Sequence, residues 1–479
     1  MKRSQTMQQS GGAQALPANE IALLLQAGIA QREAMPWLRS KPTVSGRFSR
    51  DVAAFSKFWR LGAAVRQKLP EKSKRNAAQA TAAAAILRME RQAREDFLGA
   101  HIDTLYRKLT EDYHKFERVE TLIYSAGKTV AGLVPTPAEI EREDQLVQKD
   151  KDGLEIDQGI LLAHIFAHPP SGRHLCHAMQ LQRPETEEHL ARFLATGALD
   201  LGTAAVERLG KAAVVEFRNP RYFNALDMGN VDQLEIAAEV AILDPHSQIV
   251  VLRGGKIGHP KWVGRRVFSS GINLTHLYYG KISYHFYFKH AMGFENRIMR
   301  GIARPDSPPD EITGTTIEKA WIASVDGFAI GGGCQHLLAA DYVLAADDAY
   351  MTLPARREGI IPGMSNMRLP RFTGYRIARQ AILNDRRLDC DSPEGRLICD
   401  EIAPRDKMDE ALINVIDRLT SSGVVSAVAN RRAFRIGQEP IDLFRQYLAV
   451  YAREQAYCHF SPALIANLER HWKARERKI

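Results

Sequence analysis

The sequence predicts an α/β protein in which a helical N-terminal region precedes a core of strands and helices. Three observations lead to this fold class. Residues 21–203 show helical spacing of apolar side chains and almost no strand-like alternation, short β-branched runs begin after residue 203, and helical patterns separate those runs. Strands that alternate with helices are typical of a sheet covered by helices.

The N-terminal region divides into a tail and a helical domain. Residues 1–20 mix polar and small side chains without apolar periodicity, and we expect a mobile tail there. In the helical domain, residues 21–203, apolar side chains between 98 and 109 recur at helical spacing, and residues 77–85 are rich in alanine. Two pairs of prolines, around residues 136 and 169, predict several helices with short breaks.

The core is expected over residues 204–405. Runs rich in β-branched and small apolar residues predict strands at 212–217, 248–252, 320–325 and 342–346, and apolar spacing predicts a helix at 231–241. Residues 406–479 return to helical periodicity. We expect these C-terminal helices to pack outward from the core and to serve oligomerisation.

Composition limits the class of protein. The chain has 479 residues, 45% hydrophobic and 25% charged, which is typical of a folded globular protein with more than one domain. Five scattered cysteines suit a reducing compartment, and neither a signal peptide nor a membrane span is recognisable, so we expect a cytoplasmic protein without a membrane partner. The net charge of +9 is compatible with nucleic acid or with an anionic small substrate, and composition alone leaves both open.

Two glycine-containing turns each follow a predicted strand. They are residues 267–274, VFSSGINL, and residues 326–335, DGFAIGGGCQ, and the second opens a helix. Glycine lets the backbone approach a ligand closely, and free amides at a helix start can hold an oxygen that gains negative charge. Either turn alone is equally compatible with a simple tight turn. The second is no dinucleotide fingerprint, because its glycine spacing differs.

Taken together, the two turns resemble those of the crotonase (enoyl-CoA hydratase/isomerase) superfamily. The resemblance covers about residues 201–403 and includes segments 217–226, 353–354, 359–363 and 368–374. It implies a ββα spiral core, a trimer or dimer of trimers, and an acyl-CoA substrate whose thioester oxygen accepts hydrogen bonds from the amides of Ile272 and Gly332. A CoA ligand, which is polyanionic, would also account for the positive charge better than nucleic acid does.

The resemblance further implies a set of binding residues. Those expected to contact the acyl group are Leu226, Ser270, Gly271, Asn273, Leu274, His290, Gly331 and Gly333, and those expected at CoA are Ala225, Arg265 and Arg266. Asn273 replaces the aspartate that is usual in the first loop.

The acid/base positions argue against simple hydration. Hydratases of this superfamily carry one glutamate after the glycine triplet and another after a later proline, where this chain has Gln335 and Ala355. An amide is no general base at neutral pH, and alanine has no titratable group. Gln335 is kept as a catalytic candidate by its position. Glu358 lies at a different offset, and we expect a structural or surface role for it.

A narrower resemblance is to the metal- and cofactor-free (3,5-dihydroxyphenyl)acetyl-CoA 1,2-dioxygenases of the superfamily. It rests on the helical N-terminal region, the 326–335 loop and the segments 259–269, 354–363 and 429–432. It implies that the enolate reduces O2 directly and that the peroxide then attacks the thioester, which releases CoA and a 2-oxo acid. No metal or cofactor is implied, and O2 is a co-substrate. The aromatic run 284–288 is expected either to wall the O2 site or to pack in the core.

Two departures change the expected substrate. The dioxygenases carry a glutamate and an arginine for the two ring hydroxyls, where this chain has Leu226 and His290. We therefore expect a less hydroxylated arylacetyl group or another stabilised acyl-CoA. Two other classes stay open: an isomerase, hydrolase or C–C lyase that uses His290 or Glu358 as base and needs no O2, and a basic nucleic-acid-binding protein. His164 and His168, four residues apart, lack an accompanying acidic motif, and we expect structural histidines.

Overall fold

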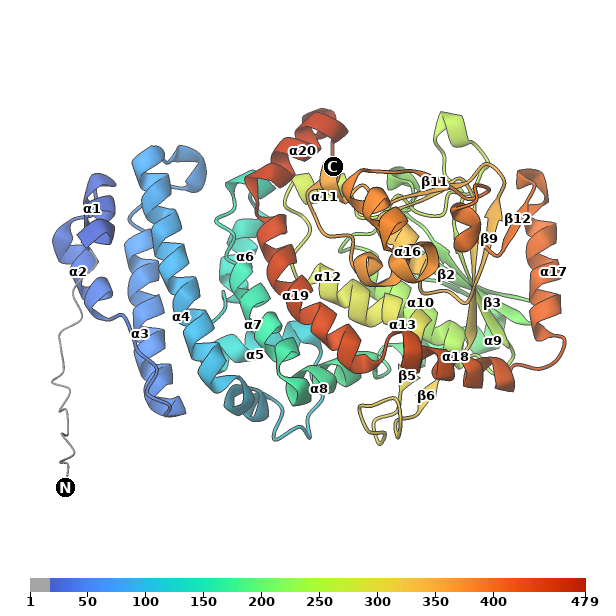
Figure 1. The fold of residues 1–479 in the computed structure, drawn as a ribbon, viewed down its shortest axis with the longest axis horizontal. Coiled ribbons are helices and arrows are strands. Elements are labelled where there is room, and N and C mark those ends of the chain that lie inside the picture. Colours follow the sequence, from blue (N-terminus) through green and yellow to red (C-terminus); the bar gives the residue numbers. More distant parts are fainter. Residues whose placement is uncertain (1–17) are drawn as a thin grey trace, which may run out of the picture. The chain divides into compact units, whose positions relative to one another are not determined.

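A computed structural model describes residues 18–479 and is drawn in Figure 1. The mobile tail expected over residues 1–20 lies outside the described residues, except for its last three positions. The chain forms two compact units, one with residues up to Ala100 and Val130–Leu133, the other with His101–Thr129 and Val134–Ile479.

The first unit is helical. Its elements are α1 (Ala18–Gln26), α2 (Gln31–Arg39), α3 (Phe48–Arg66) and the greater part of α4 (Ala77–Leu109). Buried aromatic rings form its core: Trp37 stacks on Phe58 with ring centroids 5.5 Å apart, and Phe97 contacts Trp59. The Arg94 guanidinium donates to the backbone carbonyls of residues 132 and 133 and so fastens this short segment to α4.

The second unit begins with more helices. They are α5 (Val119–Thr129), α6 (Pro137–Asp144), α7 (Ile156–Ala167), α8 (Pro169–Gln180) and α9 (Thr186–Thr196). Pro137 and Pro169 each occupy the first turn of a helix, where the missing N–H costs no hydrogen bond. The predicted helical character of residues 21–203 therefore holds to Thr196.

The main sheet of the described chain is mixed. Its strands, in spatial order, are β1 (Ala198–Asp200), β2 (Ala204–Leu209), β3 (Ala212–Phe217), β4 (Ile249–Gly254), β7 (Ala320–Val325), β9 (Tyr342–Ala346) and β12 (Glu401–Ala403). Strands β1 to β3 pair antiparallel, and β3, β4, β7, β9 and β12 pair parallel. Helix α10 (Val231–Leu243) makes the crossover from β3 to β4. All four predicted strands and the predicted helix are confirmed.

Short elements lie beside this sheet and carry the loops. The strands are β5 (Ile302–Ala303), β6 (Thr316–Ile317), β8 (Phe328–Ile330), β10 (Tyr350–Thr352) and β11 (Leu388–Asp389). The helices are α11 (Leu274–Tyr278), α12 (Phe286–Phe288), α13 (Glu295–Arg300), α14 (Gly332–Leu337), α15 (Ala355–Glu358) and α16 (Ser365–Leu383). A π-helical turn, η5 (Lys289–Phe294), joins α12 to α13.

The C-terminal segment is helical, as predicted. It contains α17 (Met408–Thr420), α18 (Val425–Gln438), α19 (Ile441–His459) and α20 (Pro462–Trp472). Helix α19 runs along α7 (Figure 1), and the Tyr284 hydroxyl donates to the Ala452 carbonyl of α19 at 2.5 Å. The described chain thus has the predicted fold class, an α/β core with added helices at both ends. None of the single helices described is long and apolar enough to cross a membrane. The bent pair of helices at residues 405–420 and 425–438 meets the requirements for a span by length and composition only.

Candidate active site

The first glycine loop is held by a short backbone bridge. The Leu226 amide donates to the Gly271 carbonyl at 2.7 Å, and the Asn273 amide donates to the Leu226 carbonyl at 2.8 Å. These bonds pair Leu226 with Ile272 as in a parallel sheet. Gly271 itself has φ +78°, a conformation that side chains disfavour.

The second glycine loop lies directly against the first. Ser269 accepts from the Ile330 amide at 2.9 Å and donates its own amide to the Phe328 carbonyl at 3.2 Å. A Cβ atom at Gly271 would lie 2.5 Å from the Ile330 carbonyl oxygen and 3.1 Å from the Gly332 nitrogen. Only glycine at position 271 allows the two loops to approach this closely.

Two backbone amides remain free where the loops meet. Among the described residues, neither the Ile272 nor the Gly332 N–H donates to any acceptor. Gly332 is the first residue of α14, so its amide adds the positive end of a helix dipole, weak in so short a helix. Two unsatisfied donors at one place can hold an oxygen that gains negative charge.

Both amides border one small cavity of about 40 Å³. We call it the glycine-loop pocket; its lining residues are Leu226, Ile272, Phe286, Tyr287, His290, Ala291, Gly331, Gly332, Gln335, Glu358, Ile360, Ile361, Pro362, Gly363 and Tyr451. The structure therefore gathers six of the predicted site residues round one cavity: Leu226, Ile272, His290, Gly331, Gly332 and Gln335.

Glu358 is a buried acid in this pocket, so the expectation of a surface role for it is wrong. Its side chain is only 7% exposed, and no described residue gives its carboxylate a hydrogen bond or a cation. A Cβ atom at Gly331 would lie 4.0 Å from both carboxylate oxygens. Burial, assisted by the negative charge of Asp385, raises the Glu358 pKa to about 8.

His290 lines the pocket on the π-helical turn, but its ring nitrogens face other protein groups. Its Nε2 lies 2.9 Å from the Nε2 of His336, so one ring donates and the other accepts. Its Nδ1 lies 3.7 Å from Oε2 of Glu295. Burial, together with the positive charge of Arg368, lowers the His290 pKa to about 4. The ring is therefore neutral near pH 7 and is bound into a buried network.

The remaining walls combine aromatic rings with two unpaired polar groups. The Gln335 side-chain amide lies close against Gly363 and forms no hydrogen bond with a described residue. The Tyr451 hydroxyl also forms no hydrogen bond with a described residue. Of the aromatic run, Phe286 and Tyr287 reach the pocket, whereas Tyr284 and Phe288 are fully buried in the core. Part of the run thus lines the pocket and part packs in the core, and its role at an O2 site stays a prediction.

Five predicted acyl-contact residues do not line the pocket: Ser270, Gly271, Asn273, Leu274 and Gly333. The Ser270 hydroxyl donates to the Tyr222 carbonyl at 2.8 Å. The Asn273 side chain accepts from the His276 amide at the start of α11 and donates to Asp227. The side-chain polar atoms of Ser270 and Asn273 thus hold the loop in this structure, and the assignment of these residues to the acyl group stays a prediction.

The three predicted CoA residues lie outside the pocket, and their assignment stays a prediction. Arg265 pairs with Asp348 at 2.8 Å and Arg266 with Glu216 at 2.6 Å. The Ala225 carbonyl accepts from Asn219 and Asn230.

Sequence reasoning named Glu358 only as a base of the alternative reaction classes, and it missed Tyr451 and the wall at residues 360–363 as pocket residues. A signal existed for Glu358, since a charged residue stands there directly before a glycine and the apolar run Ile360–Ile361. Gly359 has φ +83° and ends α15, which turns the chain back over the pocket. Tyr451 comes from α19, more than 80 residues further on, and no local pattern links it to the loops.

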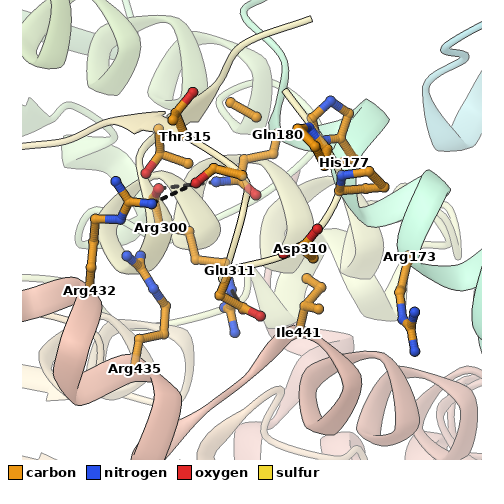
Figure 2. A pocket seen from close by; sticks show the side chains of 15 residues that line it. Arg173, His177, Gln180, Arg300, Asp310, Glu311, Thr315, Arg432, Arg435 and Ile441 are labelled. Carbon is orange, nitrogen blue, oxygen red and sulfur yellow. Dashed lines mark hydrogen bonds and ion pairs between the residues drawn. The ribbon is translucent and has the colours of Figure 1, made fainter. Parts of the chain in front are cut away.

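A second cavity lies elsewhere in the same unit (Figure 2). Arg300, Arg432 and Arg435 border it, but two of them are neutralised by carboxylates: Arg300 pairs with Glu439 at 3.0 Å and Arg435 with Glu318 at 2.8 Å. Arg432 donates to the Gly314 carbonyl at 2.6 Å. None of its lining residues belongs to the glycine-loop pocket. Within residues 18–479, no three His, Cys, Asp or Glu side chains are grouped to hold a metal ion.

Comparison with known proteins places these loops in a family. Residues 207–447 match the enoyl-CoA hydratase/isomerase family. The chain is 41% identical over 389 residues to the (3,5-dihydroxyphenyl)acetyl-CoA 1,2-dioxygenase of Amycolatopsis orientalis, a match that covers 81% of this chain and 88% of that protein. It is 23% identical over 237 residues to a probable enoyl-CoA hydratase of Rhizobium meliloti (strain 1021), covering 48% of this chain and 80% of that protein. A solved enoyl-CoA hydratase from Mycobacterium avium subsp. paratuberculosis K-10 superposes with a TM-score of 0.46 at 20% identity, covering 58% of this chain and 99% of that one.

Proposed function

Because this chain belongs to the enoyl-CoA hydratase/isomerase, or crotonase, family, we propose that it is a dioxygenase acting on an arylacetyl-CoA thioester. The reaction converts the thioester and O2 to CoA and a 2-oxo acid without a metal or an organic cofactor. The identity to the dioxygenase of Amycolatopsis orientalis, which extends over 81% of the chain, supports this reaction over the others of the family.

One observation carries the proposal: the free amides of Ile272 and Gly332 border the same pocket. The thioester oxygen accepts both N–H groups, which form an oxyanion hole. Negative charge develops on that oxygen when the α-carbon loses a proton, so the donors stabilise the enolate more than the thioester. Removing one such donor costs about 3–4 kcal/mol of barrier in a water-excluded site.

The chemistry then follows from the enolate. Its electrons reduce O2, and a peroxide forms at the α-carbon. The terminal peroxide oxygen attacks the thioester carbonyl and expels the CoA thiolate. Cleavage of the O–O bond, with loss of the second α-proton, leaves the 2-oxo acid, so both oxygen atoms enter the product. Phe286 and Tyr287 supply an apolar wall that admits O2 and excludes water.

The pocket favours an acyl group with few ring hydroxyls. At the two positions that the resemblance assigns to ring hydroxyls, Leu226 offers no hydrogen bond and the nitrogens of His290 face His336 and Glu295. A ring hydroxyl left unpaired there costs about 1–3 kcal/mol. Phenylacetyl-CoA or a monohydroxylated analogue therefore fits better than the dihydroxyphenyl thioester.

Hydration is not proposed, because the pocket lacks its two acids. Gln335 and Ala355 occupy the positions where the resemblance places glutamates. Activation of water for addition to a double bond needs a base at one of them.

Further attributes belong to the same proposal. The enzyme works in the cytoplasm as a trimer or dimer of trimers, and Arg265 and Arg266 bind the CoA phosphates once their present carboxylate partners are displaced.

Oxygen consumption tests the function. The purified chain is given phenylacetyl-CoA, its 3-hydroxy and 3,5-dihydroxy analogues and butyryl-CoA, each with EDTA present, and O2 uptake, free thiol and 2-oxo acid are measured. From an arylacetyl thioester we expect one free thiol and one 2-oxo acid for each O2 consumed. From butyryl-CoA we expect no O2 uptake and neither product. Absence of O2 uptake with every arylacetyl thioester would refute the proposal.

A second candidate is an isomerase, hydrolase or C–C lyase that forms the same enolate without O2. Glu358 favours it as much as the dioxygenase, since a carboxylate beside the loops can move a proton in either reaction. Anaerobic turnover of an acyl-CoA, with no O2 consumed in air, would support this candidate instead.

A further inference from the structure

We propose that Glu358 is the base that removes the α-proton of the thioester. This inference rests on the proposed enolate chemistry and adds to it the group that starts the reaction. Neither position that the resemblance reserves for a glutamate holds one, so the proton must go to another side chain of the pocket.

Position selects Glu358 among the pocket side chains. Both of its carboxylate oxygens lie 4.0 Å from where a Cβ of Gly331 would stand, and Gly331 directly precedes the Gly332 amide of the oxyanion hole. A thioester oxygen on that amide has its α-carbon one bond beyond the carbonyl carbon, which is within reach of this carboxylate. The acid belongs to the reacting end of the pocket.

The bonding state of Glu358 also selects it. Its side chain is more than nine-tenths buried, yet no described residue hydrogen-bonds or ion-pairs with it. A carboxyl group buried without a partner destabilises the fold, so its retention calls for a role in which it meets a ligand. His290, the other titratable candidate, already shares a hydrogen bond with His336.

The charged and titratable groups around Glu358 leave it ionisable. Asp385 faces it and raises its pKa, while Arg356 and Arg357, on its own helix, pair with Asp385 at 3.1 and 3.0 Å. Tyr287 faces it from α12, and Tyr451 lines the same pocket from α19. The neighbouring contacts from α20 come from neutral residues, Leu464 and Asn467.

The proposed step is a proton transfer. The α C–H bond breaks, its electron pair forms the C=C bond of the enolate, and the carbonyl π pair moves to the oxygen held by Ile272 and Gly332. The proton forms an O–H bond on Glu358 and is available for the departing CoA thiolate.

The test compares four variants with the wild-type full chain: Glu358→Gln, Glu358→Asp, Asp385→Asn and, as a control on a distant exposed carboxylate, Glu410→Gln. Three quantities are measured: anaerobic exchange of the α-proton of phenylacetyl-CoA in D2O, O2 uptake, and binding of a non-reacting thioether analogue of the substrate. Circular dichroism shows whether each variant is folded.

We expect Glu358→Gln to lower exchange and O2 uptake together by about 10²–10⁴-fold, with thioether binding within a few fold of wild type. Glu358→Asp should retain part of the activity, because it keeps the carboxylate at a greater distance. Glu410→Gln should match wild type.

The pH profile separates a base from a structural side chain. With a pKa of about 8, wild-type exchange should rise up to about pH 8 and level off above it. Burial is the larger cause of this raised pKa and the charge of Asp385 adds to it, so Asp385→Asn should move the rise to lower pH. The substitution is tolerable, since Asp385 has φ +56°, where asparagine is also common, and Arg356 and Arg357 are more than half exposed.

The outcomes are distinguishable. Exchange that survives in Glu358→Gln, or a pH profile unmoved by Asp385→Asn, would overturn the role of Glu358 while the dioxygenase proposal stands. Exchange that depends on Glu358 without any O2 uptake would refute the dioxygenase and leave the base assigned. A wild-type chain that exchanges no proton with any arylacetyl thioester would overturn both.

Discussion

At the scale of single residues, Gly271 is the position where the backbone tolerates least change. Alanine there would meet the Ile330 carbonyl at 2.5 Å and would have to adopt φ +78°. We expect Gly271→Ala to displace the Ile272 amide and to lower kcat by about 10²–10³-fold, as loss of one oxyanion donor does. Initial rates with the best arylacetyl thioester measure this effect.

Gly210→Ala is the matched control for this substitution. Gly210 also has positive φ, +57°, but a Cβ atom there would meet nothing within 4 Å. Both variants share the conformational strain of alanine at positive φ. Only Gly271→Ala adds a clash that forces the two glycine loops apart. Equal activity of the two variants would contradict the role given to the loop contact.

The sequence predicted those site residues that local motifs carry. Ile272 and Gly332 lie within contiguous glycine loops, and their meeting follows from short-range backbone pairing. Glu358 was named only as a base of the alternative reaction classes, and Tyr451 was missed. These two residues reach the pocket through a helix end and through a separate helix, which only tertiary packing brings together. Asn273 was assigned to the substrate, although an Asn before a helix is also an ordinary N-cap, which is what the structure shows.

At the scale of elements, Glu439 connects three helices. It lies just after α18, is fully buried and binds Arg300 of α13 and Arg368 of α16 at 3.0 and 2.8 Å. These guanidinium groups hold the pKa of the Glu439 carboxyl far below its usual range. Glu439→Gln would leave two buried cations with no carboxylate from this position, and we expect it to lower the free energy of unfolding by about 3–5 kcal/mol. Urea denaturation measures the change.

Asp391→Asn provides the comparison for Glu439→Gln. Asp391 pairs with Arg396 at 2.5 Å, but both side chains are at least 50% exposed. Water replaces the lost partner there, and the expected change is about 0–1 kcal/mol. A small effect of Glu439→Gln as well would contradict the view that its network holds the three helices together.

Elements with a strong apolar pattern were predicted correctly, and short ones were not. Strands β3, β7 and β9 coincide with the predicted runs because each is a largely buried strand with a mostly apolar sequence. Strand β1 and the small sheet of β8, β10 and β11 have two or three residues each, too few for any periodicity. The π-helical turn that holds His290 was not predicted either, since its extra residue depends on packing around Gly293 and Glu235.

At the scale of the whole molecule, the outer face of α19 predicts association. Leu443, Val450 and Tyr457 are spaced seven apart, so they share one side of the helix, and Val450 is 64% exposed. We expect Val450→Lys to shift the proposed trimer or dimer of trimers toward smaller species in light scattering. Val44→Lys, at an exposed apolar site of the N-terminal unit, should leave the mass unchanged.

The compact units of the chain differ from the domains expected from the sequence. The change from helices to strands falls near residue 197, close to the predicted boundary at 203, but by contacts the division lies within α4. Helices α7 and α8 belong to the unit that contains the sheet, since α19 packs on both. The pattern of apolar and polar residues along the sequence indicates secondary structure, whereas a compact unit depends on which helices share a core.

The bridge between Leu226 and Ile272 distinguishes the two positions that we propose set the acyl specificity, Leu226 and His290, because they differ in how freely they can be substituted. Leu226 holds the first loop through its N–H and C=O alone, so any residue but proline preserves the loop while altering the pocket. His290 is tied by its ring to His336 and Glu295, and replacing it disturbs a buried network. A lineage acquiring a new acyl substrate would therefore change position 226 first, and a mutant library confined to that position should yield many folded enzymes with altered substrate preference.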